Sequence, residues 1–455
     1  MNQLARKILF WVFSAAFGFV SLALILYANG YRIDFKNLSV EKTGGIYIIS
    51  QPRNAEITLD NLAVSNNSNL ISPGTLIGNL TKGRYLVSVS KPGYQSWQKN
   101  ILVEPSLVAV YDQVVLVPSL NDPKTGAEEI YPASPTSTRS TSLPIEDFDL
   151  VEGNQFLIQR NGNLIYSGTF LRGNRLIASS PSGFLITGGP SGEYYLIDLT
   201  LNYKTVSIGP LLTRLKETEL SLPGPAKILT LSFSPLGDEN LLIQTTGALY
   251  ELDVIRGDLK IIDRGVLAYA SSANKIYYLD KDGLHSYDPI IQSNADVLPL
   301  PPAFAGRTGQ FEFQVSPSGN YFALLGPNHD LYLGAEDGQS FQKISSRVND
   351  FSFSYDSKFL AAITENGLAE IYDLNLDKLF SLNPHLENPT QITWYKDSAH
   401  LFVMSGGNLY LMEIDSKNPP LNVTKIADGV KAFRYDSADD FLYFTPGSEI
   451  WRLII

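Results

Sequence analysis

A recurring pattern of apolar and polar positions runs through the chain from about residue 147 to its end. In its clearest copy, residues 353–374, an aromatic residue is followed by a polar turn, an apolar stretch, a glycine turn and a second apolar stretch: FSYDSKFLAAITENGLAEIYDL. Similar copies begin at four other residues, namely Phe233, Gln314, Trp394 and Phe433. Apolar runs of this length between turn residues predict antiparallel strands joined by short turns.

The copies recur at a nearly constant interval. Comparable positions fall near Phe148, Ser180, Phe233, Tyr269, Val315, Phe353, Trp394 and Phe433, and the last intervals are 38, 41 and 39 residues. A period near 40 residues with about four short strands per unit is typical of β-propeller blades. We therefore predict a propeller over 147–455 with eight blades. Seven blades remain an alternative, because the first unit is short and the second long, and a pair of sandwiches fits the regular period less well.

The repeats also resemble a known class of propeller. The turns Ser234-Pro235-Leu236-Gly237 and Ser316-Pro317-Ser318-Gly319, with the Leu-Tyr-x-Leu-Asp strand, are similar to those of WD-type and Tol-type β-propellers. This resemblance implies a fold, but it implies no particular function, because propellers serve both binding and catalysis.

The N-terminus carries a long uncharged apolar stretch. Residues 8–28 (ILFWVFSAAFGFVSLALILYA) would span about 30 Å as a helix, enough to cross the hydrocarbon core of a bilayer. Arg6 and Lys7 precede it, so residues 1–7 are expected in the cytoplasm and the rest of the chain outside. The alternatives are a cleaved signal peptide and a buried helix. Residues 29–42 are expected to form a juxtamembrane linker.

Residues 43–119 contain short runs of alternating polarity that predict a small antiparallel β-sandwich. This region resembles the PEGA domain in a series of turn and strand residues: Ser50-Gln51-Pro52, Ala55, Leu59-Asp60-Asn61, Ser72-Pro73, Gly83, Tyr85, Val87, Val89, Lys91, Gly93-Tyr94 and Trp97. The resemblance implies a spacer or adhesion module of prokaryotic surface proteins, without catalytic residues. Asn54 and Asn61 replace the glycines usual in that family, and Asn tolerates the left-handed backbone that such turns need. Tyr94 and Trp97 are interpreted as core residues rather than as an exposed glycan site.

Residues 120–146 are rich in Pro, Ser and Thr and predict an extended linker. One piece differs, because Glu128-Glu129-Ile130-Tyr131 has the composition of a short strand. The last repeat ends about one strand short at the C-terminus. We therefore hypothesise that residues 128–131 complete the last blade, with a plain linker as the alternative.

Composition and charge narrow the function. The chain of 455 residues has no cysteine, which excludes disulfides and thiolate chemistry. Residues 1–119 carry ten Lys or Arg and six Asp or Glu, a net +4, whereas the remainder carries 25 and 40, a net −15. An acidic body argues against nucleic-acid binding, which needs a basic face.

Candidate catalytic and metal-binding motifs are weak. His285, His329, His385 and His400 are isolated in the sequence and are interpreted as surface turn residues. The S-x-x-K match at Ser88–Lys91 and the K-T-G match at Lys42–Gly44 stand in the wrong order for serine acyl-transferases. The acidic runs 280–283 and 436–440 lack the ligand spacing of a calcium loop. The sequence therefore assigns no catalytic, cofactor-binding or metal residue and no cofactor.

Together these features predict a membrane-anchored, extracytoplasmic binding or scaffold protein of a prokaryotic cell envelope. The sandwich would act as a spacer, and the propeller would present a surface to an envelope protein or glycan. A hydrolase or lyase acting on an envelope polymer is the first alternative, and it predicts carboxylates converging in the central channel. A purely structural surface component is the second.

Overall fold

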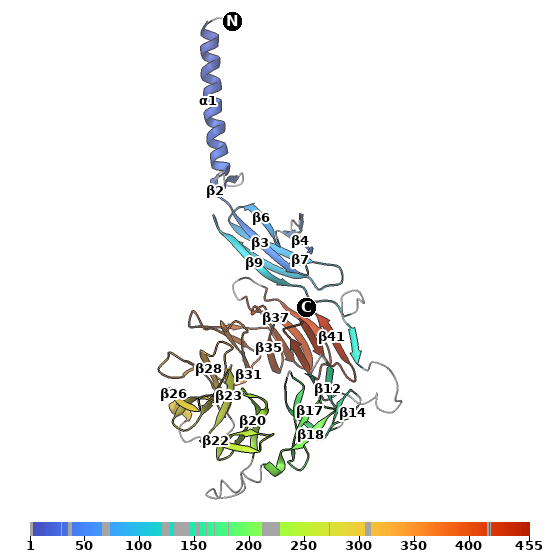
Figure 1. Ribbon diagram of the computed structural model, residues 1–455. Helices are drawn as coiled ribbons and strands as arrows, with labels where there is room; N and C mark the ends of the chain where they lie inside the picture. The colour runs from blue at the N-terminus through green and yellow to red at the C-terminus, as the bar shows by residue number, and fades with distance from the viewer. Residues whose placement is uncertain are drawn as a thin grey trace. The chain divides into compact units, whose positions relative to one another are not determined.

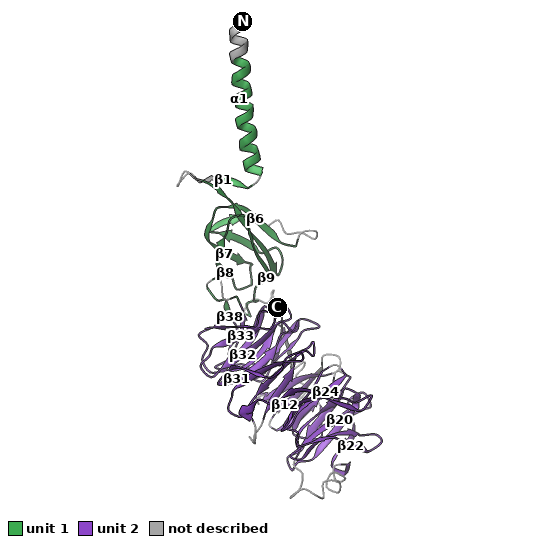
Figure 2. Ribbon diagram, turned by 90° about the vertical axis from the view of Figure 1, so that its left-hand side faces the viewer, with its two compact units in different colours: residues 1–125, 415–424, 455 green, residues 126–414, 425–454 purple. Residues whose placement is uncertain are grey.

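The computed structural model describes residues 3–28, 30–34, 39–65, 73–120, 128–131, 145–151, 155–160, 162–167, 169–180, 182–211, 228–272, 274–304, 311–415, 418 and 420–455. The chain is mainly β and divides into two compact units, which are coloured separately in Figure 2. Unit 1 comprises residues 1–125, 415–424 and 455. Unit 2 comprises residues 126–414 and 425–454.

Unit 1 begins with one long helix, α1 (Gln3–Ala28), drawn in blue in Figure 1. Its stretch Leu9–Ala28 has the length and composition of a membrane span, and none of it is buried within the protein. A membrane span and a signal sequence share these properties, so the helix is compatible with the expected anchor over residues 8–28. Residues 29–42, expected to be a linker, contain a hairpin in which β1 (Tyr31–Asp34) pairs with β2 (Ser39–Lys42).

Two sheets follow in unit 1. A three-stranded sheet has the order β6-β3-β9 and a four-stranded sheet has the order β5-β4-β7-β8. Their strands are β3 (Gly44–Gln51), β4 (Glu56–Leu59), β5 (Leu62–Val64), β6 (Thr75–Leu80), β7 (Gly83–Ser90), β8 (Trp97–Val103) and β9 (Val108–Val115).

The prediction of a wholly antiparallel sandwich is wrong, because β9 runs parallel to β3. Alternation with period two is the same for both directions, so it does not reveal the orientation of a pair. After the turn at 104–107 the chain leaves β8 in one sheet and joins the other sheet. It therefore reaches the edge of β3 running in the same direction as β3.

One apolar core lies between these two sheets. It contains inward residues of both sheets, among them Ile46, Val87, Ile101 and Val114. Trp97 is only 4% exposed and belongs to this core, and Tyr94 packs at its margin, so their interpretation as core residues is confirmed. The tip of the loop over residues 64–69 lies outside the described residues.

Three turns of this region need a left-handed backbone. Asn54 and Asn61 have φ of 58° and 65°, and Gly93 has φ of 85°. Asn is the residue with a side chain that most readily adopts this conformation, so both turns keep their shape without glycine.

Unit 2 contains eight four-stranded antiparallel sheets within the described residues. The first four are β11 (Asp147–Val151), β12 (Gln155–Arg160), β13 (Asn163–Tyr166), β14 (Thr169–Phe170); β15 (Arg175–Ser179), β16 (Phe184–Gly188), β17 (Tyr194–Asp198), β18 (Lys204–Ser207); β19 (Ile228–Ser234), β20 (Gly237–Thr245), β21 (Ala248–Asp253), β22 (Asp258–Arg264); and β23 (Ala268–Ser272), β24 (Lys275–Leu279), β25 (Gly283–Asp288), β26 (Ser293–Pro299).

The next three sheets are β27 (Glu312–Val315), β28 (Tyr321–Leu325), β29 (Leu331–Ala335), β30 (Gln342–Ser345); β31 (Val348–Phe353), β32 (Phe359–Thr364), β33 (Ala369–Asp373), β34 (Lys378–Leu382); and β35 (Pro389–Trp394), β36 (His400–Ser405), β37 (Asn408–Glu413), β38 (Val423–Ala427). A short 3₁₀ helix, η1 (Pro302–Phe304), precedes β27. The eighth sheet contains β39 (Phe433–Asp436), β40 (Phe441–Phe444), β41 (Ile450–Ile454) and the early strand β10 (Glu128–Tyr131).

The predicted repeat starts coincide with these sheets. Seven of the eight starting residues lie in the first strand of a sheet, and Ser180 follows β15 directly. Three of these residues, Val315, Phe353 and Trp394, end a first strand just before a turn, whereas Phe433 begins one.

The eighth sheet closes with a strand from the other end of the chain. β10 pairs antiparallel with β41, and Arg452 binds Glu128 at 2.6 Å. The hypothesis that residues 128–131 complete the last blade is thereby confirmed. The eighth sheet also packs on the first through a shared core that includes Phe148, Ile158, Tyr443 and Ile450. A closed series of four-stranded sheets is consistent with a β-propeller.

Candidate functional site

The four histidines occupy two kinds of position. His329 and His385 lie exposed on turns with positive φ, as predicted. The prediction is wrong for His285, which lies on β25, and for His400, which lies on β36 and is 3% exposed. The ring of His400 contacts the carboxylate of Asp397 at 2.7 Å, and the same Asp accepts two amides of its turn. His400 is therefore part of a turn structure rather than a free side chain.

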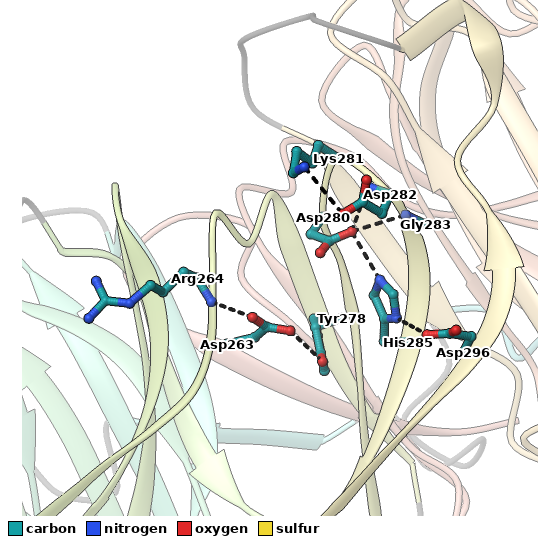
Figure 3. Close-up of polar contacts among 9 residues, drawn as sticks. All are labelled: Asp263, Arg264, Tyr278, Asp280, Lys281, Asp282, Gly283, His285 and Asp296. Carbon is teal, nitrogen blue, oxygen red and sulfur yellow. Dashed lines mark hydrogen bonds and ion pairs between the residues drawn. The ribbon is translucent and has the colours of Figure 1, made fainter.

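His285 lies at the centre of the polar cluster shown in Figure 3. Its Nε2 lies 3.0 Å from Asp280 Oδ1 and its Nδ1 lies 2.9 Å from Asp296 Oδ1. The ring stacks on Tyr278 with centroids 5.2 Å apart. Tyr278, His285 and Asp296 share one row across β24, β25 and β26, because the register pairs each with the next. The sequence did not reveal the cluster, since these residues meet only through the strand register.

Two further contacts tie the cluster to the fold. Asp280 accepts the amides of Asp282 and Gly283 at 2.7 and 3.0 Å, which fixes the hairpin between β24 and β25. The Tyr278 hydroxyl donates to Asp263 Oδ2 at 2.7 Å, and Asp263 belongs to β22 of the preceding sheet. The acidic run 280–283 is therefore a hydrogen-bonded turn.

The charges of the cluster support one another. Burial opposes the charge on His285, but Asp280 and Asp296 outweigh it and raise the pKa of the imidazole. Burial also opposes the charge on Asp280, but the two turn amides and His285 together lower the pKa of that carboxyl. For Tyr278, burial and then Asp263 raise the pKa of the phenol, so it remains a neutral donor. An imidazole held between two carboxylates is a structural arrangement, because each ring nitrogen already has a hydrogen-bond partner.

Replacing His285 by glutamine is expected to lower the free energy of unfolding by about 1 kcal/mol at pH 5. The folded protein holds the imidazole proton more tightly than the unfolded chain, so this stabilisation is complete below about pH 6.5 and is lost as the pH rises through the raised pKa. Denaturation of both proteins from pH 5 to 9 measures the difference. Lys281→Gln, which changes an exposed ion pair, serves as the control. A difference independent of pH would contradict a charged His285.

Polar side chains also line the innermost strands of unit 2, the first strand of each sheet. Five carboxylates lie on the described first strands: Asp147, Asp149, Glu312, Asp350 and Asp436. The run Asp-Phe-Asp at 147–149 recurs as Glu-Phe-Gln at 312–314 and Asp-Phe-Ser at 350–352. This polar-aromatic-polar alternation was the sequence signal for the lining residues, and it was missed.

Most of these polar groups bond to the neighbouring sheet. Arg434 donates to Asp147 at 3.1 Å and lies 3.6 Å from Asp149, which joins the last sheet to the first. Ser179 donates to Asp149 at 2.6 Å, and the amide of Ile392 donates to Asp350 at 2.8 Å. These polar side chains of the innermost strands therefore hold neighbouring sheets together.

Glu312 and Asp350 are the two lining carboxylates whose pKa is raised. Burial raises the pKa of Glu312. Burial, with repulsion from Glu312, raises the pKa of Asp350 to about 6 despite the amides of Ile392 and Phe351. A raised carboxyl pKa suits a general acid, but the described lining brings no histidine to the pair. Within the described residues, no group of three or more His, Asp or Glu side chains could hold a metal ion.

A second feature lies on the turns that join third to fourth strands. In four of them an Asp carboxylate at the end of the third strand accepts the amides two and three residues later: Asp198, Asp253, Asp288 and Asp373. Each Asp thereby fixes the turn, as the Asp of an Asx-turn does. The strand ending in Asp was visible in the repeat, but its capping role was not recognised.

These Asp-fixed turns display large apolar side chains. Leu201, Ile255, Ile290, Ile291 and Leu376 are between 60% and 70% exposed. In an antiparallel sheet the first and third turns lie at the same end, so two exposed residues of first turns, Leu236 and Tyr355, belong to the same side. We call these seven residues the apolar turn face. Exposed apolar groups concentrated on one side of a fold mark interaction surfaces.

Comparison with known proteins identifies no family for this chain. No protein-family model matches the chain, and no curated protein matches it. Similar solved structures include WD40 β-propeller proteins at low identity. The Chaetomium thermophilum Sqt1 bound to the N-terminus of ribosomal protein L10 is 16% identical, covers 66% of this chain and 89% of its own, and has a TM-score of 0.45. A chain of the Mitotic Checkpoint Complex is 11% identical, covers 60% of this chain and 86% of its own, and has a TM-score of 0.40. KlHsv2 with loop 6CD replaced by a Gly-Ser linker is 9% identical, covers 68% of this chain and 96% of its own, and has a TM-score of 0.41.

Proposed function

We propose that this chain is a membrane-anchored, extracytoplasmic scaffold protein of a prokaryotic cell envelope whose eight-bladed propeller binds a protein partner. The observation that carries the proposal is the apolar turn face. Rigid turns that hold Leu and Ile in water suit the buried centre of a protein interface, where a few apolar anchors supply most of the affinity. A glycan partner would instead need exposed aromatic and polar groups, and Tyr355 is the one aromatic residue of this face.

The anchor of the proposal is α1. Its apolar stretch is uncharged and unburied, and Arg6 and Lys7 precede it, which favours a cytoplasmic N-terminus. Residues 43–119 would form a PEGA-like spacer. The two-sheet core around Trp97 and the left-handed turns at Asn54 and Asn61 support this resemblance.

The hydrolase alternative draws less support from the geometry. It needs carboxylates free to reach a substrate, whereas Asp147, Asp149 and Asp350 each accept a hydrogen bond from a neighbouring sheet. Hydrogen bonds of the innermost strands thus hold neighbouring sheets together, and the apolar turn face is the surface that we propose for binding.

Site-specific photo-crosslinking in native membranes tests the proposal. A photoreactive residue at Ile255, Ile290 or Leu376 is expected to capture the same protein. Each position has a matched control on the second turn of its own sheet, at the opposite end: Thr246, Lys281 and Asn366. We expect the adduct at the three test positions to exceed that at their controls by about tenfold, since an interface anchor is desolvated. Equal labelling at both ends would contradict a binding role for this face, and a captured glycan would replace protein by glycan.

A further inference from the structure

A chain of backbone hydrogen bonds connects the end of α1 to the sandwich of unit 1. The amide of Gly30 donates to Tyr27 O at 3.1 Å, and the amide of Thr43 donates to Gly30 O at 2.8 Å. The amide of Ser106 then donates to Thr43 O at 3.0 Å. Neighbouring chains joined in this way lie about 5 Å apart, so the turn between β8 and β9 lies within about 15 Å of the helix end.

Arg32 reinforces this connection. Its guanidinium lies over the Tyr27 ring, 3.6 Å from the centroid, and donates to Tyr27 O at 2.9 Å. It also donates to Asn79 Oδ1 on β6 at 2.5 Å. One side chain therefore caps a carbonyl at the end of α1 and binds the sandwich, which opposes free rotation of the helix against it. Figure 1 shows β2 beside this end of the helix.

Exposed apolar residues gather at the same end of the sandwich. Leu107 is 56% exposed and Val108 is 49% exposed, and the carbonyl of Leu107 accepts the amide of Gly45 at the start of β3. Val40 on β2 is 57% exposed. Val110 follows Val108 on the same side of β9 and is 57% exposed. Moving these apolar side chains from water into an apolar environment would be favourable, so they suit a contact with an apolar surface.

Aromatic and basic side chains accompany these apolar ones. Tyr27 and Tyr31 lie at the helix end, and Lys42 places its amine over the Tyr31 ring, 5.3 Å from the centroid. Tyr, Lys and Arg next to an apolar span are the residues that favour the boundary between lipid and water. Residues 1–119 carry a net charge of +4, in contrast to the acidic remainder.

We propose that this end of the sandwich is a second membrane contact. Strands β1 and β2 and the turn between β8 and β9 lie at the lipid headgroups, with Val40, Leu107 and Val108 toward the acyl boundary and Lys42 against anionic headgroups. The occupant is lipid rather than protein because the hydrogen-bonded path to this turn begins at Tyr27, in the last turn of the proposed membrane span. The inference rests on the proposed function, because it requires α1 to span the membrane.

Depth-dependent fluorescence on the full-length protein tests this inference. The chain has no cysteine, so single labels are placed without removing native residues. The polarity-sensitive fluorophore NBD is attached to Leu107→Cys, Val108→Cys and Val110→Cys in liposomes of phosphatidylcholine with or without phosphatidylglycerol. Glu56→Cys is the control, because Glu56 is exposed and pairs with Ser90 at the far end of β7. A lipid-borne quencher then reports contact with the bilayer.

We expect quenching at Leu107→Cys and Val108→Cys to exceed that at Glu56→Cys by about threefold, with Val110→Cys between them. Phosphatidylglycerol should increase quenching at Leu107→Cys, and the added Lys42→Gln substitution should remove the increase.

A label at Phe17→Cys separates the two proposals. If it is not quenched, α1 does not span the bilayer and the proposed anchor fails. If it is quenched but Leu107→Cys and Val108→Cys match Glu56→Cys, the anchor stands and the second membrane contact is wrong.

Discussion

Replacing Asp415 by alanine is expected to lower the free energy of unfolding of unit 1 by about 3–5 kcal/mol. Asp415 Oδ2 lies 3.3 Å from Lys99 Nζ, and the Lys99 side chain is 0% exposed. Lys99 lies on β8 at a core-facing position between Trp97 and Ile101. Without Asp415 a buried ammonium group would lose its carboxylate, and such a charge is far costlier in a core than in water. Hydrogen exchange of the amides of β7 and β8 in the full-length protein measures the effect.

The double variant Lys99→Met with Asp415→Ala is the matched control. A flexible apolar side chain in place of a buried ion pair is often neutral or stabilising, so the double variant is expected to remain within about 1 kcal/mol of the native protein. Lys99→Met alone should also be mild, because Asp415 is 22% exposed and retains contact with water. If Asp415→Ala proved as mild as the double variant, the ion pair would not be what compensates the charge of Lys99.

Lys99 also shows a contact that the sequence pattern cannot predict. In the alternating pattern of β8, Lys99 occupies an inward position together with Trp97, Ile101 and Val103. A charged residue in an inward register signals a buried partner, but nothing local identifies that partner. That partner, Asp415, follows β37 closely in the sequence and belongs to unit 1 with the rest of residues 415–424. Periodicity reports on neighbours along one strand and carries no information about such distant segments.

The eight sheets, in contrast, followed from the sequence because each repeat contains its own strands and turns. The closing strand was foreseen for a similar reason: the last repeat visibly lacked one strand, and the composition of residues 128–131 supplied it. The parallel pairing of β9 with β3 and the row from Tyr278 to Asp296 were not foreseen. Both depend on how strands are ordered and aligned, which the alternation of polar and apolar residues leaves open.

Replacing Asp350 has the second large expected effect, and this replacement stabilises the protein, whereas Asp415→Ala destabilises it. Replacing Asp350 by asparagine is expected to raise the free energy of unfolding of unit 2 above pH 7 by up to about 3 kcal/mol, the difference between a pKa of about 6 and the ordinary value of 3.8. The native carboxyl is buried near Glu312, so the folded protein resists its ionisation. Asparagine is neutral at every pH, and its carbonyl can still accept the amide of Ile392.

The pH dependence distinguishes this explanation from a simple change in packing. Below about pH 3 Asp350 is mostly protonated in both the folded and the unfolded chain, so the two proteins should differ little. As the pH rises to about 6, only the unfolded chain releases the proton freely, and the native protein loses stability relative to Asp350→Asn. Above about pH 7 the difference should be constant. Denaturant unfolding of both proteins between pH 3 and 8 measures this curve.

Two further variants identify the source of the shift. Glu312→Gln removes a neighbouring negative charge and so lowers the pKa of Asp350 in the folded protein. In that background the stability gain from Asp350→Asn should level off at a lower pH and at a smaller value. Asp147→Asn alters another carboxylate of the innermost strands, but this one accepts a hydrogen bond from Arg434, so its replacement should destabilise unit 2 by up to about 1 kcal/mol. A gain in stability from Asp147→Asn equal to that from Asp350→Asn would mean that the whole lining repels charge. Hydrogen bonds between neighbouring sheets would then not explain why carboxylates are found on the innermost strands.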